Sequence, residues 1–449
     1  MKNIVLIGLP GCGKTTIGRQ VAKRTGRAFI DLDDKLVQDT GMTIPDIFAQ
    51  FGEPGFRDRE TAVCRSVAGW QNTVISCGGG VVLRPENVDA LRQNGTLVFI
   101  DRPAEDIVRG VDVSGRPLLA EGAERVYRLA AERDRLYREY ADVILPNTGA
   151  RADAIDALVA WMTKSPLRLA VIGDPIAHSL SPAIHQPTLD VLCPGSSYEK
   201  IHVRRGELAS FVETARQQLD GFNLTMPHKA DILPLLDEID PAAAAIGAVN
   251  TVAVRDGKLC GTGTDGGGFF TALAEKGVKV TDKHIVILGT GGVAITLAVY
   301  GAEHGIRALT VVGRQADKAA AITQKAASVA PSLLTKTYPF SDIAAACREA
   351  DILINATPLG MEGVAEDWSD LSFLQALPPH AVVCDLIYKP AKTAFLQAAE
   401  VAGHPIQNGL DMLLYQAILA DEFYLGVTLG RRRMVSLVRE TLAANERKS

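Results

Sequence analysis

The residues with the clearest chemical potential occupy positions 8–16, which read Gly-Leu-Pro-Gly-Cys-Gly-Lys-Thr-Thr. The apolar run 3–7 before them predicts a buried parallel strand, and the helix-forming segment 14–24 follows directly. The spacing G-x-x-x-x-G-K-[ST] between a strand and a helix is typical of a loop whose backbone N–H groups surround phosphate oxygens. Lys14 is placed to reach the β- and γ-phosphates and Thr15 to hold Mg²⁺, so the segment predicts a nucleoside-triphosphate site.

Carboxylates follow the second predicted strand, residues 28–32. Asp31 and Asp33 come where that strand ends, and the carboxyl ends of parallel strands face the crevice in which ligands bind. One carboxylate can therefore lie near Mg²⁺ and another near an acceptor hydroxyl. A cluster that only caps a helix N-terminus is the alternative interpretation.

Glycine-rich and arginine-bearing segments complete the candidate site of the first half. A third predicted strand, 73–77, runs into three glycines at 78–80, which suit either close approach of backbone to a small ligand or a plain tight turn. Residues 111–123 are loop-like with Arg116 near their centre, as a lid over a triphosphate would be. Arg57 begins a helix, where a solvated surface charge is the alternative.

Hydroxyl, amide and charged groups recur in the second half at strand and turn ends. Ser179 and Ser181 precede a predicted helix, where they either cap it or bind a carboxylate at its N-terminus. Lys229, Asn250 and Asp265 each follow a strand or turn, and such positions face a cleft. A Lys and an Asp in a cleft can place a proton donor beside a carbonyl oxygen, whereas a surface ion pair is the bland alternative.

A dinucleotide-binding pattern follows the strand predicted over 283–288. Residues 289–294 read G-x-G-x-x-A at the start of a helix, the setting that this fingerprint requires. The next predicted strand, 308–312, leads to Arg314 and not to an acidic residue. Because an acidic side chain there would bind the ribose hydroxyl of NAD, Arg314, helped by Lys318, favours the 2′-phosphate of NADP over NAD.

The elements that must position these groups alternate between strand and helix along both halves, which predicts α/β domains with parallel sheets. A chain of 449 residues suffices for two or three domains.

Composition excludes several classes of protein. The net charge of −5 gives no excess of basic residues with which to bind nucleic acid or anionic membranes. The apolar start is interrupted by Gly8 and Pro10 and predicts neither a signal peptide nor a membrane span. Seven scattered cysteines without a C-x-x-C pair indicate reduced thiols in the cytoplasm, without structural zinc.

The order of the motifs in the first half resembles that of shikimate kinase. The phosphate loop is followed by Asp-x-Asp, Phe-Arg-x-x-Glu, Gly-Gly-Gly, Gly-Arg-Pro-Leu-Leu and Arg-x-x-x-Tyr. The resemblance implies that Asp33 holds the acceptor hydroxyl and acts as the base. It also implies that Arg57 and Arg133 clamp the carboxylate of shikimate, while Gly79 and Gly80 contribute backbone donors.

The same resemblance assigns the nucleotide site. Asp31 would orient the Mg²⁺ waters beside Thr15, Arg116 would neutralise charge on the transferring phosphoryl group, and Arg109 would stack on the adenine of ATP. The residues around the phosphates would be Gly11, Cys12, Gly13, Lys14, Thr15 and Thr16.

The second half resembles shikimate dehydrogenase from end to end. It contains His-Ser-x-Ser-Pro, Asn-x-Thr-x-Pro-x-Lys, Gly-Ala-Val-Asn-Thr, Gly-x-x-Thr-Asp-Gly, the glycine fingerprint and Gly-Leu-Asp-Met-Leu. By this resemblance Lys229 and Asp265 form the acid/base pair. The implied substrate residues are Ser179, Ser181, Thr225, Lys229, Asn250, Asp265, Tyr388 and Gln416. The implied NADP residues are Gly289, Gly291, Gly292, Val293, Ala294, Arg314 and Gly409.

Together these patterns predict a domain order. Residues 1–164 would form a P-loop kinase domain, residues 166–270 plus 405–449 an α/β catalytic domain, and residues 271–404 a Rossmann domain that binds NADP. The predicted protein is a bifunctional enzyme that reduces 3-dehydroshikimate to shikimate with NADPH and phosphorylates shikimate at its 3-hydroxyl with MgATP.

Two alternatives to this function stay open at the level of sequence. One is a non-catalytic regulator that keeps both folds to sense metabolites, and the other is a dehydrogenase half that prefers quinate or NAD. The predicted partners are the two small acids and not nucleic acid or membrane, and the sequence is compatible with a homo-oligomer.

Overall fold

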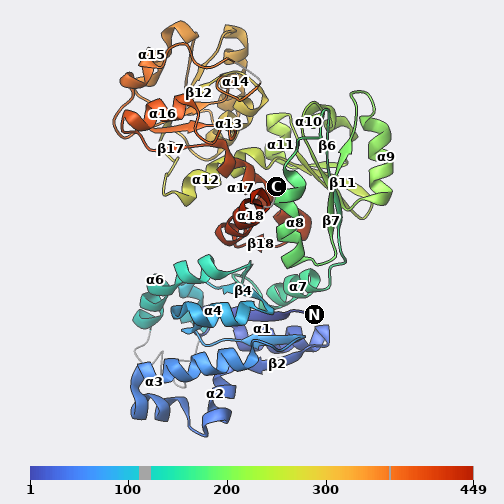
Figure 1. Cartoon of the computed structure of the whole chain (residues 1–449), viewed down its shortest axis with the longest axis vertical. Coiled ribbons are helices and arrows are strands. Elements are labelled where there is room, and N and C mark those ends of the chain that lie inside the picture. Colours follow the sequence, from blue (N-terminus) through green and yellow to red (C-terminus); the bar gives the residue numbers. More distant parts are fainter. Residues whose placement is uncertain (111–122, 364–365, 448–449) are drawn as a thin grey trace. The chain divides into compact units, whose positions relative to one another are not determined.

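The computed structural model describes residues 1–110, 123–363 and 366–447 of the chain (Figure 1). The chain forms two compact units. The first comprises Met1–Pro166, Pro187–Gly195 and Leu425–Ser449, and the second comprises Leu167–Gln186 and Ser196–Tyr424. Both units are built from alternating strands and helices, which confirms the predicted α/β class.

The first unit is organised around a six-stranded sheet in the order β18-β5-β4-β1-β3-β2. Its strands are β1 Asn3–Ile7, β2 Ala28–Asp31, β3 Thr73–Ser76, β4 Gly95–Asp101, β5 Val143–Pro146 and β18 Thr428–Leu429. The apolar strand β1 is fully buried and pairs in parallel with β3 and β4 on its two sides. β2 and β5 extend this parallel sheet, whereas β18 runs antiparallel to β5.

The helices of the first unit connect these strands. They are α1 Lys14–Thr25, α2 Leu32–Thr40, α3 Ile44–Val67, α4 Pro85–Arg92, α5 Ala104–Gly110, α6 Ala123–Tyr140, α7 Arg151–Met162 and α18 Arg431–Glu446. α1 packs against α7, and α3 packs against α4. α1 ends at Gly26, which adopts a positive φ of 67° and donates its N–H to Ala22 O, the usual glycine C-cap. The predicted strand 3–7 is confirmed, and the helix predicted over 14–24 extends to Thr25.

The second unit contains two sheets. The first has the order β7-β6-β8-β10-β11-β9, and it is mixed because β10 runs antiparallel to both β8 and β11. Its strands are β6 Arg168–Gly173, β7 Ser197–His202, β8 Gly221–Leu224, β9 Glu238–Ile239, β10 Thr251–Arg255 and β11 Lys258–Thr262. The helices around it are α8 Ser181–Leu192, α9 Leu208–Gln218, α10 His228–Asp231, α11 Pro241–Ile246, α12 Asp265–Glu275 and α17 Gly409–Leu425.

The other sheet of the second unit is entirely parallel, with the order β14-β13-β12-β15-β16-β17. This doubly wound order places a topological switch point beside β12, where such sheets bind dinucleotides. Its strands are β12 His284–Leu288, β13 Ala308–Val312, β14 Leu334–Tyr338, β15 Ile352–Asn355, β16 Val382–Asp385 and β17 Ile406–Gln407. Its helices are α13 Gly292–Glu303, α14 Ala316–Val329, α15 Ile343–Cys347 and α16 Ala394–Val401.

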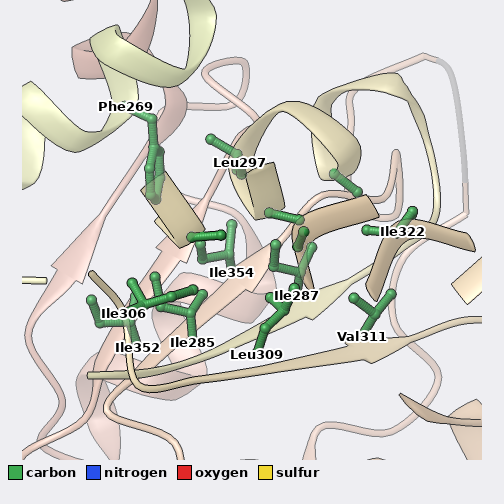
Figure 2. Packing of buried hydrophobic residues seen from close by; sticks show 14 of the residues in the cluster. Phe269, Ile285, Ile287, Leu297, Ile306, Leu309, Val311, Ile322, Ile352 and Ile354 are labelled. Atoms are coloured by element: carbon green, nitrogen blue, oxygen red, sulfur yellow. The ribbon is translucent and has the colours of Figure 1, made fainter. Parts of the chain in front are cut away.

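One apolar core holds the helices against this parallel sheet. Ile287 and Leu309 from the neighbouring strands β12 and β13 are fully buried, and Leu297 of α13 and Ile322 of α14 pack over them (Figure 2). Phe269 of α12 joins the same core. Fully burying side chains of this size contributes about 1.5–3 kcal/mol each, so this core fixes α12 to the parallel sheet.

Three of the predicted domain limits need correction. The limit at residue 270 would cut α12, whose Phe269 packs into the core just described. The limit at 405 falls before β17, which pairs with β16 in the parallel sheet. The segment Leu425–Ser449, expected in the catalytic domain, groups with the first unit because β18 pairs with β5 there.

Two observations bear on environment and metals. Among the described residues, no helix combines the length and the apolar character needed to cross a bilayer. All seven cysteines are buried free thiols, and within the same described ranges no group of three or more His, Cys, Asp or Glu side chains is arranged to hold a metal ion.

Candidate functional sites

The phosphate-binding loop connects β1 to α1. Gly8, Gly11 and Gly13 adopt φ values of 143°, 86° and 105°, which side chains other than glycine rarely tolerate. Lys14 is the first residue of α1 and is only 7% exposed. Its Nζ donates to the carbonyl oxygens of Gly8 at 2.8 Å and Leu9 at 2.9 Å. The ammonium group is thus held within the loop, at the end of the helix where anions are favoured.

Side chains that carry oxygen atoms lie beside the loop, where β1, β2 and β3 end. Thr15 Oγ1 donates to Asp31 Oδ2 at 2.7 Å and lies 3.3 Å from Ser76 Oγ. Asp31 Oδ1 also accepts from Asp33 N at 3.1 Å, so Asp31 caps α2 while facing Thr15, a geometry compatible with both interpretations of this carboxylate. A hydroxyl and a carboxylate of this kind are ligands suited to Mg²⁺. Ser76, the last residue of β3, was not among the predicted site residues.

Asp33 lies against the glycine segment. Burial, followed by the charges of Asp31 and Glu60, raises its pKa to about 6. A Cβ added to Gly78 would lie 2.8 Å from Asp33 Oδ1, so glycine at this position lets the carboxylate approach the backbone. A carboxylate with a pKa near neutrality suits a general base.

The two arginines predicted to clamp a carboxylate meet at the same glycine segment. Arg133 Nη1 donates to Gly79 O at 3.0 Å, and a Cβ added to Gly80 would lie 2.2 Å from Arg57 Nη1. The two side chains are 5% and 7% exposed. Each has a buried Nε without a hydrogen-bond partner in the described part of the chain. A buried unpaired donor is costly, and an anionic ligand would satisfy both.

Arg57 also has partners that the sequence did not reveal. Its Nη1 donates to Glu60 Oε2 at 2.8 Å and its Nη2 to Glu53 Oε1 at 3.2 Å. The Glu53 side chain is 63% exposed, whereas that of Glu60 is 5% exposed, so Glu53 is the partner that a ligand can replace. Tyr137 OH donates to Gly79 O at 2.5 Å. Gly79, which was expected to contribute a backbone donor, offers in this structure a carbonyl oxygen that orients Arg133.

A polar cavity of about 240 Å³ lies next to the phosphate-binding loop and is lined by Arg102, Asp106, Arg109, Asn147, Thr148 and Gly149. Arg109 is 77% exposed and pairs with Asp106 at 3.3 Å. Asn147, which follows β5, was not predicted. Its Nδ2 donates to Cys12 O of the phosphate loop at 2.8 Å. Arg116 lies outside the described residues.

A second site is a cavity of about 420 Å³ in the second unit. The walls include every substrate-binding residue that was predicted in that half, together with the predicted Gly409 and Val293. These lining residues are Ser179, Ser181, Thr225, Lys229, Asn250, Asp265, Tyr388 and Gln416. They come from segments spread over more than half of the chain, and the fold brings them to one place.

Lys229 and Asp265 form an ion pair inside this cavity. Lys229 Nζ donates to Asp265 Oδ2 at 2.6 Å, and their side chains are 30% and 17% exposed, so the pair is not the surface bridge of the alternative interpretation. Asp265 begins α12, where the helix dipole favours a carboxylate. Asn250 Nδ2 donates to Asp265 Oδ1 at 3.0 Å and to Gln416 Oε1 at 3.3 Å. The amide therefore orients the carboxylate that faces the lysine.

The serine pair lies at the start of α8. Ser179 Oγ donates to Ser181 Oγ at 3.1 Å and accepts from Ser181 N at 3.2 Å. The hydroxyls thus bond to each other near a helix start and also line the cavity, so the capping and ligand-binding interpretations are both compatible with the geometry.

A buried polar network that the sequence did not reveal supports the cavity wall. His185, which lines the cavity, lies 2.6 Å from Asp421 Oδ1 through its Nδ1. Its ring stacks on Tyr198 at 4.3 Å, and Tyr198 OH donates to Asn223 Oδ1 at 2.6 Å. Burial raises the pKa of Asp421, and His185 opposes that shift. The partners are 236 residues apart, and no local spacing could have indicated the pair.

The glycine fingerprint leads from β12 into α13. Gly289 adopts a φ of 114°, and a Cβ there would lie 2.8 Å from Ala356 O, so this turn requires glycine. Gly291 and Gly292 are exposed, and a Cβ on either would meet nothing within 4 Å. A ligand therefore has free access to the backbone at the N-terminus of α13. Ala294 is buried.

Arg314 follows β13 at the same edge of the sheet. Arg314 and Lys318 are both exposed, and in the described ranges neither forms an ion pair. No acidic residue follows β13 directly, so the local charge is that of a phosphate-binding position and not of a ribose-hydroxyl acceptor.

The phosphate-binding loop of the first unit is typical of phosphotransferases that use a nucleoside triphosphate. The glycine fingerprint beside the cavity of the second unit is typical of oxidoreductases that use a dinucleotide. Family models match in the same order: "Shikimate kinase" over residues 10–163, "Shikimate dehydrogenase substrate binding domain" over 171–252 and "Shikimate / quinate 5-dehydrogenase" over 272–363. The shikimate dehydrogenase (NADP(+)) of Alkaliphilus oremlandii (strain OhILAs) is 40% identical over 262 residues, which cover 58% of this chain and 91% of that protein.

Solved structures agree with this match. The shikimate 5-dehydrogenase of Listeria monocytogenes in complex with shikimate and NAD is 31% identical with a TM-score of 0.58, and the match covers 62% of this chain and 96% of that chain. The enzyme of Thermus thermophilus in complex with NADP(H) and shikimate is 33% identical with a TM-score of 0.54, covering 61% of this chain and 99% of that chain.

The chain therefore belongs to the shikimate dehydrogenase family and carries a shikimate kinase domain ahead of the dehydrogenase domains. It is a bifunctional shikimate-pathway enzyme with kinase and NADP-dependent oxidoreductase activities, as the resemblance of both halves implied.

Proposed function

We propose that the chain catalyses two consecutive reactions: NADPH-dependent reduction of 3-dehydroshikimate to shikimate in the second half, and MgATP-dependent phosphorylation of shikimate to shikimate 3-phosphate in the first. The observation that carries the proposal is the convergence of the predicted substrate residues of the second half on one cavity around the Lys229–Asp265 pair.

In the reduction, Lys229 donates a proton to the 3-keto oxygen of the substrate, and Asp265 keeps the ammonium group oriented toward it. General acid assistance of this kind is worth about 10²–10⁴-fold in rate. NADPH supplies the hydride when it is bound at the fingerprint, and Val293, at the start of α13, reaches the cavity wall from that side. Asn250 and Gln416 fix the carboxylate of Asp265 and offer amide groups to substrate hydroxyls.

The carboxylate of the substrate is bound by hydroxyl groups. Ser179 and Ser181 at the start of α8, together with Tyr388, line the cavity. Thr225 lines the cavity as well, between the serines in sequence and Lys229. Hydroxyl groups accept and donate hydrogen bonds, so they can serve both the carboxylate and the ring hydroxyls of the acid. Arg314 recognises the 2′-phosphate of NADP through its planar guanidinium.

In the phosphorylation, Asp33 accepts the proton of the 3-hydroxyl as that oxygen attacks the γ-phosphorus. Arg57 and Arg133 bind the substrate carboxylate through their Nε groups, which have no hydrogen-bond partner among the described residues. Thr15 and Asp31 hold Mg²⁺ and its waters, and Lys14 neutralises the phosphate oxygens. Arg109 stacks on the adenine, and Arg116 is proposed, on the resemblance alone, to neutralise the transferring group.

Initial-rate assays on the purified full chain test both reactions. Shikimate with NADP⁺ should give NADPH absorbance at 340 nm, and shikimate with MgATP should give ADP and a phosphate monoester detectable by ³¹P NMR. Quinate and NAD⁺ are the matched controls, because one family model names quinate and the Listeria structure contains NAD. A chain that leaves shikimate unchanged with both nucleotides would be a regulator, and one that is faster with quinate or NAD⁺ would correct the substrate or the cofactor.

A further inference from the structure

The two-residue strand β18 covers the β5 edge of the kinase sheet. Thr428 and Leu429 pair antiparallel with Ile144 and Val143. An edge strand presents unpaired N–H and C=O groups, and β18 satisfies part of that edge. The residues of β18 follow the dehydrogenase helix α17 in sequence, although they group with the kinase unit.

Gly430, the residue after β18, is in direct contact with the backbone of the residues that precede β5. Gly430 N donates to Asp142 O at 3.0 Å. A Cβ added to Gly430 would lie 1.7 Å from Ala141 O, far inside any separation that real atoms adopt. The contact therefore requires glycine at position 430.

The first turn of α18 then supplies a charge to a buried carboxylate. Asp142 is 2% exposed, and its carboxylate accepts from Leu97 N at 2.8 Å. Arg433 of α18 approaches Asp142 Oδ1 at 3.6 Å and Arg92 of α4 approaches it at 3.8 Å. Burial raises the pKa of Asp142, whereas the charge of Arg92 and the backbone hydrogen bond, followed by Arg433, lower it. Removing the cationic partner of a buried carboxylate strongly destabilises the folded state.

Apolar contacts hold the rest of the segment. Leu429, Met434, Val435 and Val438 are all buried, and Met434 and Val438 are completely so. α18 packs against α6, the helix that carries Arg133 and Tyr137 to Gly79. The segment thus touches both β5 and a helix of the candidate kinase site.

The strand covered by β18 leads directly to the phosphate-binding loop. Asn147 follows β5, is 6% exposed, and donates to Cys12 O at 2.8 Å, while its own N–H donates to Asp101 O at 2.8 Å. We propose that residues 428–438 are a working part of the kinase, with Gly430 and Arg433 as positioning residues that hold β5 in the register in which Asn147 supports the loop. The partner of the β5 edge is thus the C-terminal segment of the same chain.

The test uses the full-length chain with Gly430→Val, Arg433→Ala and the control Arg447→Ala, an exposed arginine at the end of α18. Kinase and dehydrogenase kinetics are measured on one preparation, with hydrogen exchange of the amides over 141–149. For both positioning variants we expect a rise of at least tenfold in the kinase KM for ATP and faster exchange of these amides. The kinase KM for shikimate and the dehydrogenase kcat/KM should stay within twofold, and Arg447→Ala should match the wild type.

Two outcomes would overturn the proposal. Unchanged ATP kinetics and unchanged exchange would show that the kinase does not need the segment, and parallel loss of both activities would show that the segment only stabilises the chain as a whole. Arg433→Ala removes one side chain without a steric clash, so it decides the matter even where Gly430→Val does not fold. The proposal rests on the phosphotransferase reaction proposed above, whose own failure would appear separately, as absence of phosphorylation by the wild type.

Discussion

The two sites that we propose for the same small acid recognise it by different chemistry. The kinase site offers the guanidinium groups of Arg57 and Arg133, whose buried Nε donors have no partner in the part of the chain that the structure describes. The dehydrogenase cavity offers hydroxyl and amide groups around one Lys–Asp pair. A phosphoryl transfer gathers negative charge, which cations stabilise, whereas a ketone reduction needs one proton donor and a well-oriented substrate. In our proposal the same carboxylate is bound by two guanidinium groups at one site and by hydroxyl groups at the other.

Removing the proton donor should give the largest effect and separate the two sites. Lys229→Ala is expected to lower dehydrogenase kcat about 10²–10⁴-fold, while phosphorylation of shikimate by the same protein stays near normal. Steady-state assays of both reactions measure this. Lys258→Ala is the matched control, because Lys258 pairs with Glu238 at 3.0 Å on the surface, where such pairs contribute little. Loss of both activities in a folded Lys229→Ala protein would contradict independent sites.

Changing the shape but not the charge of the kinase clamp should give the next largest effect. Arg57→Lys keeps a cation beside Glu60 but loses the Nε donor and the planar fork. We expect the kinase KM for shikimate to rise about 10–100-fold, the value of one hydrogen bond to a charged group, with the KM for ATP unchanged. Arg138→Lys, at an exposed ion pair with Asp101 and Asp134, is the control. Equal weakening of shikimate and ATP would argue against the clamp.

The cofactor preference of the dehydrogenase should depend on one exposed arginine. Arg314→Ala is expected to lower the ratio of kcat/KM for NADP⁺ to that for NAD⁺ by roughly tenfold, because a charge-assisted hydrogen bond to the 2′-phosphate is lost. Arg307→Ala, at the opposite end of β13 and paired with Asp282 and Asp351, is the control. An unchanged ratio would place NADP recognition elsewhere in the site.

The proposed kinase base should show a pH signature and a smaller effect on stability. Since the pKa of Asp33 is about 6, the kinase kcat/KM should fall about tenfold per unit below that pH and level off above it. Because the folded-state pKa lies above the usual aspartate value, the ionised carboxylate destabilises the fold at high pH, and protonation removes this cost. Asp33→Asn should therefore raise the free energy of unfolding by about 3 kcal/mol at pH 8.

That gain should shrink as the pH falls through about 6 and vanish below the usual aspartate pKa of about 3.9, and thermal unfolding at a series of pH values measures it. If Asp33→Asn instead lowered the free energy of unfolding at pH 8, the ionised carboxylate would stabilise the folded state, which would contradict a raised pKa. Asp34→Asn, at an exposed position beside it, is the control and should change stability little.

Local motifs carried most of what could be predicted. The phosphate loop and the glycine fingerprint are each a single unbroken stretch of sequence. Their conformations follow from positive φ values and close approaches that only glycine allows. The order of the motifs, through the resemblance, added residues distant in sequence such as Arg133. The individual roles of these residues stay predictions until the variants are measured.

What could not be predicted depends on pairing between distant segments. His185 and Asp421 each look unremarkable in the sequence, and only the fold brings them together. The strand β18 has two residues, too few for any periodic pattern, and its partner β5 lies in the first third of the chain. The helix α12 packs Phe269 into the core of the parallel sheet while its first residue, Asp265, lines the cavity, so no single residue could have marked a domain limit there.

The closure of the β5 edge by β18 has a practical consequence for anyone who wishes to separate the two enzymes. A gene fragment that stops at codon 166 encodes a kinase whose outermost strand is bare, with Asp142 deprived of one of its two arginines. To obtain the kinase alone with this edge covered, codons 425–449 would have to be fused to the fragment that encodes residues 1–166.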